Sequence, residues 1–334
     1  MRTTALVVSL CAASFLSTCG DSTGGSSGAG LTGSVPGAGG STSIVPVDKF
    51  SMANGCYAIQ SVATGKHVAQ SGTAYVANAA LSAAEAFYMK PSALGKYLIY
   101  ARDRSLVSAS TTAVSSSTTL GEPVDFTVER LPNGHYSIAS AFAAKSLSTA
   151  GDGTLTLAST PGAFEFVPTT GCTPFPELTD DAVGETFKGN GVDKPVIGFA
   201  DAHSHISVNT SFFAGGQWWG DVVNRFGVTE ALGNCEATHG PMGVRDGNNI
   251  VQTTPTDTHD TVGWPTFVDW PGPHRLTHQG AYYKWLERAW KSGLRIITVN
   301  GTNIEALCDV ARQTDGHALD YTCDDMELAE IGRA

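Results

Sequence analysis

The sequence predicts a multidomain chain in which an all-β domain, over residues 51–172, precedes an α/β part, over residues 173–334. Two observations predict this order. The first region repeats short alternating strands three times, and the second contains a strand, a helix and another strand in succession. The charged fraction of 15% and the 38 glycines indicate a secreted, loop-rich chain.

Residues 1–19 are expected to form a lipoprotein signal peptide. A short basic start precedes an apolar core over residues 5–16, which is too short for a permanent membrane helix. Leu16-Ser17-Thr18-Cys19 resembles a bacterial lipobox, in which Cys19 would carry the lipid, although Thr18 is unusual there. An ordinary secretory signal is the alternative. Residues 20–50 are rich in Gly, Ser and Thr and predict a flexible linker, so we expect a lipid-anchored protein of the bacterial cell envelope or its exterior.

The all-β domain is predicted from tyrosine-headed segments that recur 40 and then 39 residues apart, at Tyr57, Tyr97 and Tyr136. Each repeat also has a later phenylalanine and an intervening aliphatic residue, which we assign as Phe87, Phe126 and Phe166, and as Val68, Leu106 and Leu147. We interpret these residues as core. The pattern resembles a β-trefoil of the fascin or ricin-lectin kind, and this resemblance implies a targeting module with carbohydrate as a possible partner. The Gln-x-Trp signature of ricin-type lectins is absent, because none of the 6 Trp lies in this region.

Two cysteines mark the edges of this domain. Export permits disulfides, and a bridge between Cys56 and Cys172 would tie the ends of the domain together. Of the 7 cysteines, Cys235, Cys308 and Cys323 follow the domain, so one of these three is expected to stay unpaired.

The α/β part begins with an apolar run over residues 195–200 that predicts a buried strand, and this run leads into Asp201-Ala202-His203-Ser204-His205. Side chains two apart on a strand share a face, so His203 and His205 could bind one divalent cation, for which zinc is the expected choice. A catalytic zinc lowers the pKa of its bound water to about 7 and makes it a nucleophile. Asp201 is the candidate for orienting one of these ligands.

This strand resembles the first strand of the amidohydrolase superfamily of TIM-barrel hydrolases. The resemblance continues with a helix expected over residues 280–293, a strand over 294–299 and a helix over 304–311. It implies a metal-activated water that attacks an amide, ester or phosphoester in a small-molecule or peptide substrate. A complete barrel needs about 250 residues, so we expect only its first portion here, in a truncated and inactive product. About seventy residues separate His205 from Thr277, and this insertion places His239 and His278 among the candidates near the metal.

Two other functions stay open at this point. A phosphoesterase of the polymerase-and-histidinol-phosphatase type begins with the same Asp-x-His-x-His pattern. A non-catalytic surface-binding lipoprotein with a decayed or truncated barrel is the second. Nucleic acid is not an expected partner, because residues 177–334 hold 22 acidic and 11 basic side chains, a difference that equals the net charge of -11, and no basic patch occurs.

Overall fold

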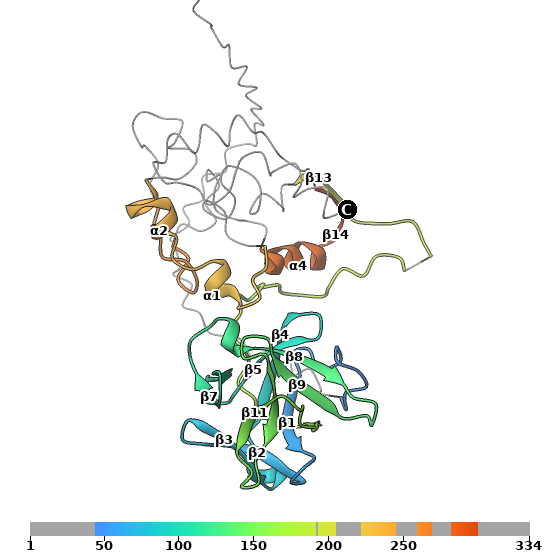
Figure 1. The fold of residues 1–334 in the computed structure, drawn as a ribbon. Helices are drawn as coiled ribbons and strands as arrows, with labels where there is room; N and C mark the ends of the chain where they lie inside the picture. Colours follow the sequence, from blue (N-terminus) through green and yellow to red (C-terminus); the bar gives the residue numbers. More distant parts are fainter. Residues whose placement is uncertain (1–43, 192, 205–221, 245–258, 269–281, 300–334) are drawn as a thin grey trace, which may run out of the picture. The chain divides into compact units, whose positions relative to one another are not determined.

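The computed structural model describes residues 44–191, 193–204, 222–244, 259–268 and 282–299. Most of the described regular structure is β (Figure 1). The first twelve strands are β1 (Cys56–Ser61), β2 (Lys66–Ser71), β3 (Ala74–Ala79), β4 (Phe87–Ala93), β5 (Lys96–Tyr100), β6 (Leu106–Ala109), β7 (Val114–Ser117), β8 (Asp125–Arg130), β9 (Tyr136–Ser140), β10 (Lys145–Thr149), β11 (Leu155–Ala158) and β12 (Phe164–Pro168). Two short 3-10 helices, η1 (Leu81–Ala83) and η2 (Glu122–Val124), lie between them.

Six of these strands close into an antiparallel barrel. Strand β1 pairs with β4, β4 with β5, β5 with β8, β8 with β9, β9 with β12, and β12 returns to β1. Closure leaves no open edge between the first strand and the last, which removes the exposed backbone groups that an open sheet would present.

The other six strands form three hairpins, β2 with β3, β6 with β7, and β10 with β11. Isolated bridges connect the hairpins to one another, Val76 with Thr154 and Ala113 with Thr156. Each repeat thus supplies two barrel strands and one hairpin, which is the strand arrangement of a β-trefoil. The repeat in the sequence has its physical basis in this threefold arrangement.

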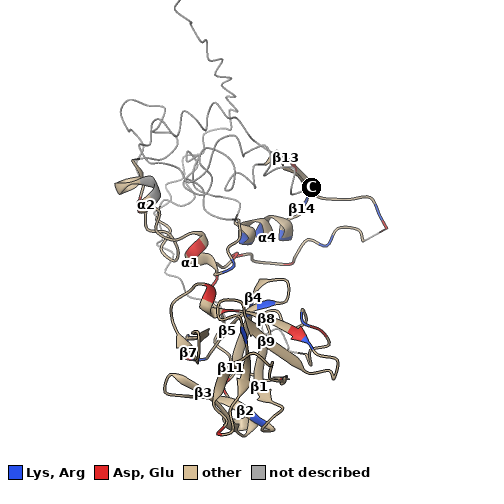
Figure 2. Ribbon diagram, viewed as in Figure 1, with Lys and Arg blue, Asp and Glu red and all other residues tan. Residues whose placement is uncertain are grey.

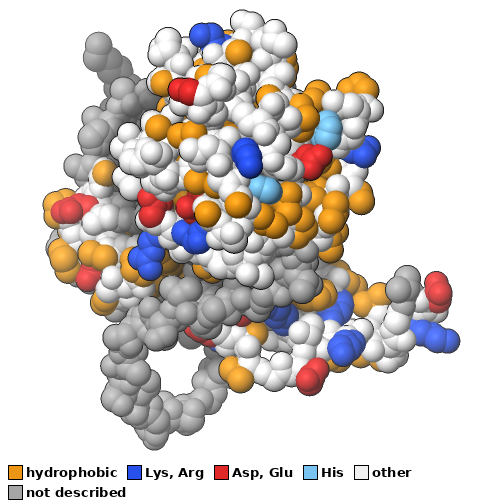
Figure 3. All heavy atoms as spheres, turned by 90° about the horizontal axis from the view of Figure 1, so that it is seen from below, with side chains coloured by type: hydrophobic (Ala, Val, Ile, Leu, Met, Phe, Trp, Pro, Cys, Tyr) orange, Lys and Arg blue, Asp and Glu red, His pale blue; other side chains and the backbone are white. Residues whose placement is uncertain are grey.

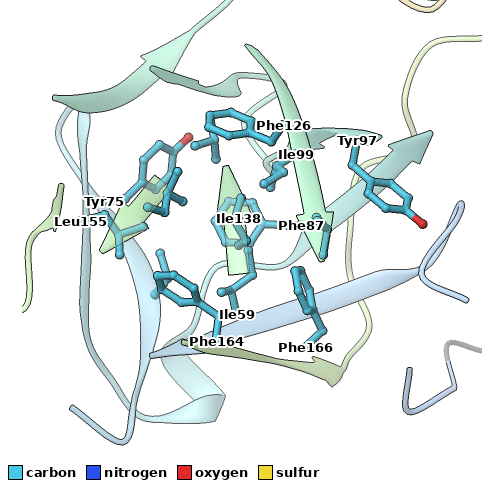
Figure 4. Packing of buried hydrophobic residues seen from close by; sticks show 14 of the residues in the cluster. Ile59, Tyr75, Phe87, Tyr97, Ile99, Phe126, Ile138, Leu155, Phe164 and Phe166 are labelled. Atoms are coloured by element: carbon cyan, nitrogen blue, oxygen red, sulfur yellow. The ribbon is translucent and has the colours of Figure 1, made fainter. Parts of the chain in front are cut away.

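The core repeats with the strands, and Figure 4 shows its side chains pointing into the barrel. Equivalent positions hold Tyr57, Tyr97 and Tyr136, then Ile59, Ile99 and Ile138, all of them buried. Two of the expected equivalences are wrong. Phe164, and not Phe166, pairs with Tyr136 as Phe87 pairs with Tyr57. Val107, and not Leu106, joins Val68 and Leu147 in the central cluster, because strand alternation turns Leu106 to the outer face.

Residues 44–51 lie across one end of the barrel, and we call this segment the strap. The three repeated tyrosines all donate hydroxyl hydrogen bonds to it: Tyr57 to the carbonyl of Ile44 at 3.0 Å, Tyr97 to that of Lys49 at 2.6 Å and Tyr136 to that of Pro46 at 3.0 Å. Burial raises the pKa of Tyr97 to about 12, with a smaller contribution from Asp48. The strap therefore satisfies three hydroxyls that the barrel would otherwise bury without a partner.

Cys56 and Cys172 form the disulfide that the sequence predicts, with their Cα atoms 5.7 Å apart. The bridge joins the start of β1 to the segment that follows β12, so it closes a loop with a sequence separation of 116 residues.

After the barrel the described elements are short. They are β13 (Phe199–Ser204), α1 (Val228–Ala231), α2 (Glu236–His239), the 3-10 helix η5 (Pro241–Gly243), α4 (Tyr283–Lys291) and β14 (Leu294–Val299). The strand and helix expected at 294–299 and 280–293 thus correspond to β14 and α4, and the helix expected over 304–311 lies outside the described residues. Strands β13 and β14 pair in parallel as a sheet of two strands.

The predicted fold class, with its α/β partial TIM barrel, is wrong. The described residues are nearly all β around the closed barrel of six strands, and they show no TIM-barrel pattern. Strand β13 was expected to be buried, yet all but its last residue are exposed. A parallel strand in a TIM barrel is covered on both faces, which these two strands are not.

Figure 3 shows one face of the molecule, where acidic and basic side chains alternate with hydrophobic ones and no field of a single charge sign forms. Among the described helices, none combines the length and the apolar character needed to cross a membrane.

Candidate functional site

The residues expected to bind a metal are not brought together in the described part of the chain. His203 is exposed on β13, and its backbone N–H donates to the Asp201 carboxylate at 3.1 Å. Asp201 thus shapes a local turn at the strand end. His205 and His278 lie outside the described residues, as does Cys19, and His239 ends the four-residue helix α2. In the described ranges, no group of three His, Cys, Asp or Glu side chains is placed to hold a metal ion.

A cavity among the described residues lies on the outer face of the barrel, against β4, and we call it the β4 pocket. Its volume is about 640 Å³, which is within the usual range for a small-molecule site. Three parts of the chain build it: the start of β1 with β4, the segment over 169–177, and the residues around 223 and 283. Its lining comprises Asn54, Cys56, Tyr88, Lys90, Pro91, Thr169, Thr170, Gly171, Cys172, Pro174, Phe175, Glu177, Val223, Asn224, Tyr283 and Lys284.

Strand alternation places two of these side chains in the pocket. In β4, Phe87 and Met89 face the barrel core, so Tyr88 and Lys90 face outward. The neighbouring strand β5 is apolar on its outer face too, where Leu98 and Tyr100 are buried. An apolar outer face needs a cover, and the chain supplies one directly after the disulfide.

Phe175 is the main part of that cover. Its ring packs edge-on against the ring of Tyr100, with centroids 5.0 Å apart, and the Lys90 ammonium lies 5.8 Å from its centroid. Phe226 packs on the same outer cluster. These packing contacts hold Phe175 and Phe226 against the outer face of β5 beside the pocket, as a preformed binding site requires.

Glu177 is fixed in the pocket by hydrogen bonds to both of its oxygens. Tyr282 donates its hydroxyl to Oε1 at 2.7 Å, Tyr283 donates to Oε2 at 2.7 Å, and the backbone N–H of Leu178 donates to Oε1 at 2.7 Å. Burial raises the pKa of both tyrosine hydroxyls, and the hydrogen bonds to the carboxylate raise it further. These phenols stay neutral donors at physiological pH and hold Glu177 in one orientation.

Lys90 is one of two lysines that line the pocket. Its ammonium donates to the carbonyl of Pro91 at 2.7 Å. Burial lowers the pKa of Lys90, and the carboxylate of Glu177 acts in the opposite direction. Lys284 also lines the pocket, and its ammonium pairs with Glu287 at 2.8 Å. Figure 2 shows the basic residues along α4 from which Lys284 comes.

Asn54 contributes a side-chain amide to the polar lining. Its backbone lies in the left-handed region, at φ 59°, which asparagine tolerates better than most residues. Tyr88 donates its hydroxyl to Asn54 Oδ1 at 3.1 Å, which orients the amide. The disulfide between Cys56 and Cys172 lies in the same wall and ties β1 to the covering segment.

An ionic contact holds the later segment against the barrel next to this pocket. Arg225 contacts Asp125 at 3.3 Å and also pairs with Glu122. The Asp125 side chain is only 3% exposed and accepts a further hydrogen bond from Ser92 at 2.6 Å. A buried carboxylate with these partners fixes the position of Asn224, which lines the pocket beside Arg225.

This pocket is not among the sites that the sequence predicts, and of its lining only the disulfide cysteines Cys56 and Cys172 were expected to have a role. A signal for the pocket was present. Strand β5 reads Lys96-Tyr97-Leu98-Ile99-Tyr100, which is apolar on both faces, whereas a barrel strand with a solvated outer face should alternate. That pattern indicates that another segment covers the outer face of β5, and it points to the region where the pocket lies.

Comparison with known proteins yields structural likenesses only. No family model matches the sequence, and no curated protein matches it. Over 34% of its length the chain is similar to a GH43 β-1,3-galactosidase, at 10% identity and a TM-score of 0.32. It is similar over 35% to SeviL, solved with asialo-GM1 saccharide, at 16% identity and a TM-score of 0.31. Over 35% it is similar to a GlcNAcα1-4Gal-releasing endo-β-galactosidase from Clostridium perfringens, at 12% identity and a TM-score of 0.31.

These matches cover 98% of the SeviL chain but only 27% and 33% of the two glycosidases. The amidohydrolase resemblance is wrong: the described residues contain no TIM barrel, and no group of three His, Cys, Asp or Glu side chains among them is placed to hold a metal ion. The zinc-dependent hydrolase that this resemblance implies is not supported either. Zinc as a cofactor is not tested by the described residues.

Proposed function

We propose that this chain is a surface-displayed carbohydrate-binding protein and that its β4 pocket holds the sugar. In this proposal Cys19 carries a lipid, the part of the expected linker that precedes the strap spaces the barrel from the membrane, and the barrel binds without catalysing a reaction. A cavity of about 640 Å³ would hold one to a few sugar rings.

One observation carries the proposal, namely the combination of side chains in the pocket. Tyr88, Phe175 and Tyr283 offer aromatic rings, while Asn54 and Lys90 offer polar groups on the same lining. A pyranose ring has apolar C–H faces and polar hydroxyl edges, so it needs both kinds of contact at once. Aromatic rings supply large apolar area, and tyrosine adds a hydroxyl for hydrogen bonding.

The hydrogen bonds that fix the side chains of the lining also support binding. Tyr282 and Tyr283 hold Glu177, Tyr88 holds Asn54, and the disulfide holds the wall between them. A site whose polar groups are fixed before the ligand arrives loses little conformational entropy on binding.

A glycan array probed with the chain from residue 20 to 334 tests the proposal, followed by calorimetric titration of the best ligands. Tyr88→Ala should weaken binding at least tenfold, and Thr170→Trp, which adds bulk to an exposed wall residue, should also weaken it. Phe142→Ala is the matched control, because Phe142 is half exposed and does not line the pocket. Thermal unfolding of each variant shows that the fold is kept. No binding to any glycan, or equal loss in the control, would refute the proposal.

A further inference from the structure

We infer that the β4 pocket selects an acidic carbohydrate, one that carries a carboxylate or sulfate group, and that the ammonium of Lys90 recognises this group. The inference rests on the proposed function and adds the chemical class of the ligand. It follows from which polar groups of the lining are already engaged within the protein.

The carboxylate of Glu177 and the amide oxygen of Asn54, two acceptors of the lining, are engaged within the protein. Both oxygens of Glu177 accept hydrogen bonds from tyrosine hydroxyls, and Oε1 accepts a second from the Leu178 backbone. The Asn54 carbonyl oxygen accepts from Tyr88. A neutral sugar presents hydroxyl donors as well as acceptors, and few of these fixed acceptors remain to receive its protons.

The donors are less engaged. A lysine ammonium has three N–H groups, and the described contact of Lys90 with Pro91 uses one of them. The Asn54 amide nitrogen brings two more donors to the same lining. Lys284 adds a second ammonium group to the lining, and this one is already paired with Glu287 at 2.8 Å, so Lys90 is the cation left to meet a ligand. A ligand rich in acceptors and negatively charged complements this inventory.

Burial strengthens the selection. The Lys90 ammonium is partly removed from water, and burial lowers its pKa for that reason. An anion bound beside it returns the electrostatic stabilisation that water no longer gives. A neutral ligand would complete the burial of this charge with only the Glu177 carboxylate to compensate it, which disfavours the neutral sugar.

Paired ligands test the inference in calorimetric titrations of the chain from residue 20 to 334: α-2,3-sialyllactose against lactose, and trigalacturonate against galactotriose. We expect each acidic ligand to bind roughly 10- to 100-fold more tightly than its neutral counterpart, which is the range of a charge-assisted hydrogen bond. Lys90→Met should abolish that preference, and Lys90→Arg should keep part of it. Lys66→Met makes the same charge change at an exposed position of β2 that does not line the pocket, so it should leave the preference intact.

The outcomes separate the two claims. Equal affinity for acidic and neutral ligands, or an acidic preference that survives Lys90→Met, would overturn the inference while carbohydrate binding stands. Binding of neither ligand pair, together with an array that stays blank, would remove the proposed function and the inference with it.

Discussion

Replacing both Cys56 and Cys172 with serine should strongly destabilise the barrel. The bridge closes a loop with a sequence separation of 116 residues, and for such a loop the chain-entropy relation gives about 4.8 kcal/mol at 25 °C. The bridge also lines the β4 pocket, so the change should reach ligand affinity as well as stability.

Urea unfolding, followed by the far-ultraviolet spectrum of the strands, measures the effect. The midpoint should fall markedly and the slope of the transition should rise, because the unfolded chain without the bridge is less compact and exposes more surface. A reducing agent should shift the wild type toward the variant. The variant itself should not respond to the reducing agent, which makes it the control. A loss below about 1 kcal/mol would show that the ends of the barrel stay together without the bridge and would refute the reasoning.

Three further predictions concern the strap and the later segment that Arg225 holds against the barrel. Tyr97→Phe removes the donor to the Lys49 carbonyl and should lower the free energy of unfolding by about 1 kcal/mol in urea; an unchanged midpoint would contradict this. Hydrogen bonds from the backbone of Ser51 and Phe50 lower the pKa of Asp48, so its contribution to strap stability is full above the ordinary value of 3.8 and is lost as the pH falls through the lowered one. In the wild type, the protection of the backbone amides of residues 48–51 against hydrogen exchange should fall as the pH drops through the lowered pKa of Asp48. In Asp48→Asn this protection should show no such fall. Arg225→Ala removes one partner of buried Asp125 and should accelerate exchange over residues 223–228, whereas unchanged exchange there would show that other contacts hold the segment.

Much of the barrel was predictable because its determinants are local and repeat. Tyr57, Tyr97 and Tyr136 recur at nearly equal spacing, and each marks an equivalent strand whose neighbour two residues on is an isoleucine. The disulfide followed from the position of its cysteines at the two ends of the repeat region. The exact equivalences were harder: Phe164 and Phe166 both face the core two residues apart, and only strand pairing distinguishes them.

The metallohydrolase interpretation failed for a different reason. The sequence showed a strand ending in Asp201-Ala202-His203, and β13 does form there, but a motif predicts chemistry only in its tertiary context. Strands β13 and β14 stay exposed, and the described residues bring no third ligand to them. The pocket was missed because its parts are distant in the sequence: Glu177 is held by Tyr282 and Tyr283, which lie 105 and 106 residues later.

Hydrogen exchange measured with and without a bound glycan tests the central claim most directly, because it locates the binding site on the chain. We predict that ligand slows exchange in β4 (Phe87–Ala93) and in the segment over 169–178, with little change in the three hairpins. Protection confined to a hairpin such as β2 with β3, and none at β4, would contradict the assignment of the β4 pocket as the carbohydrate site.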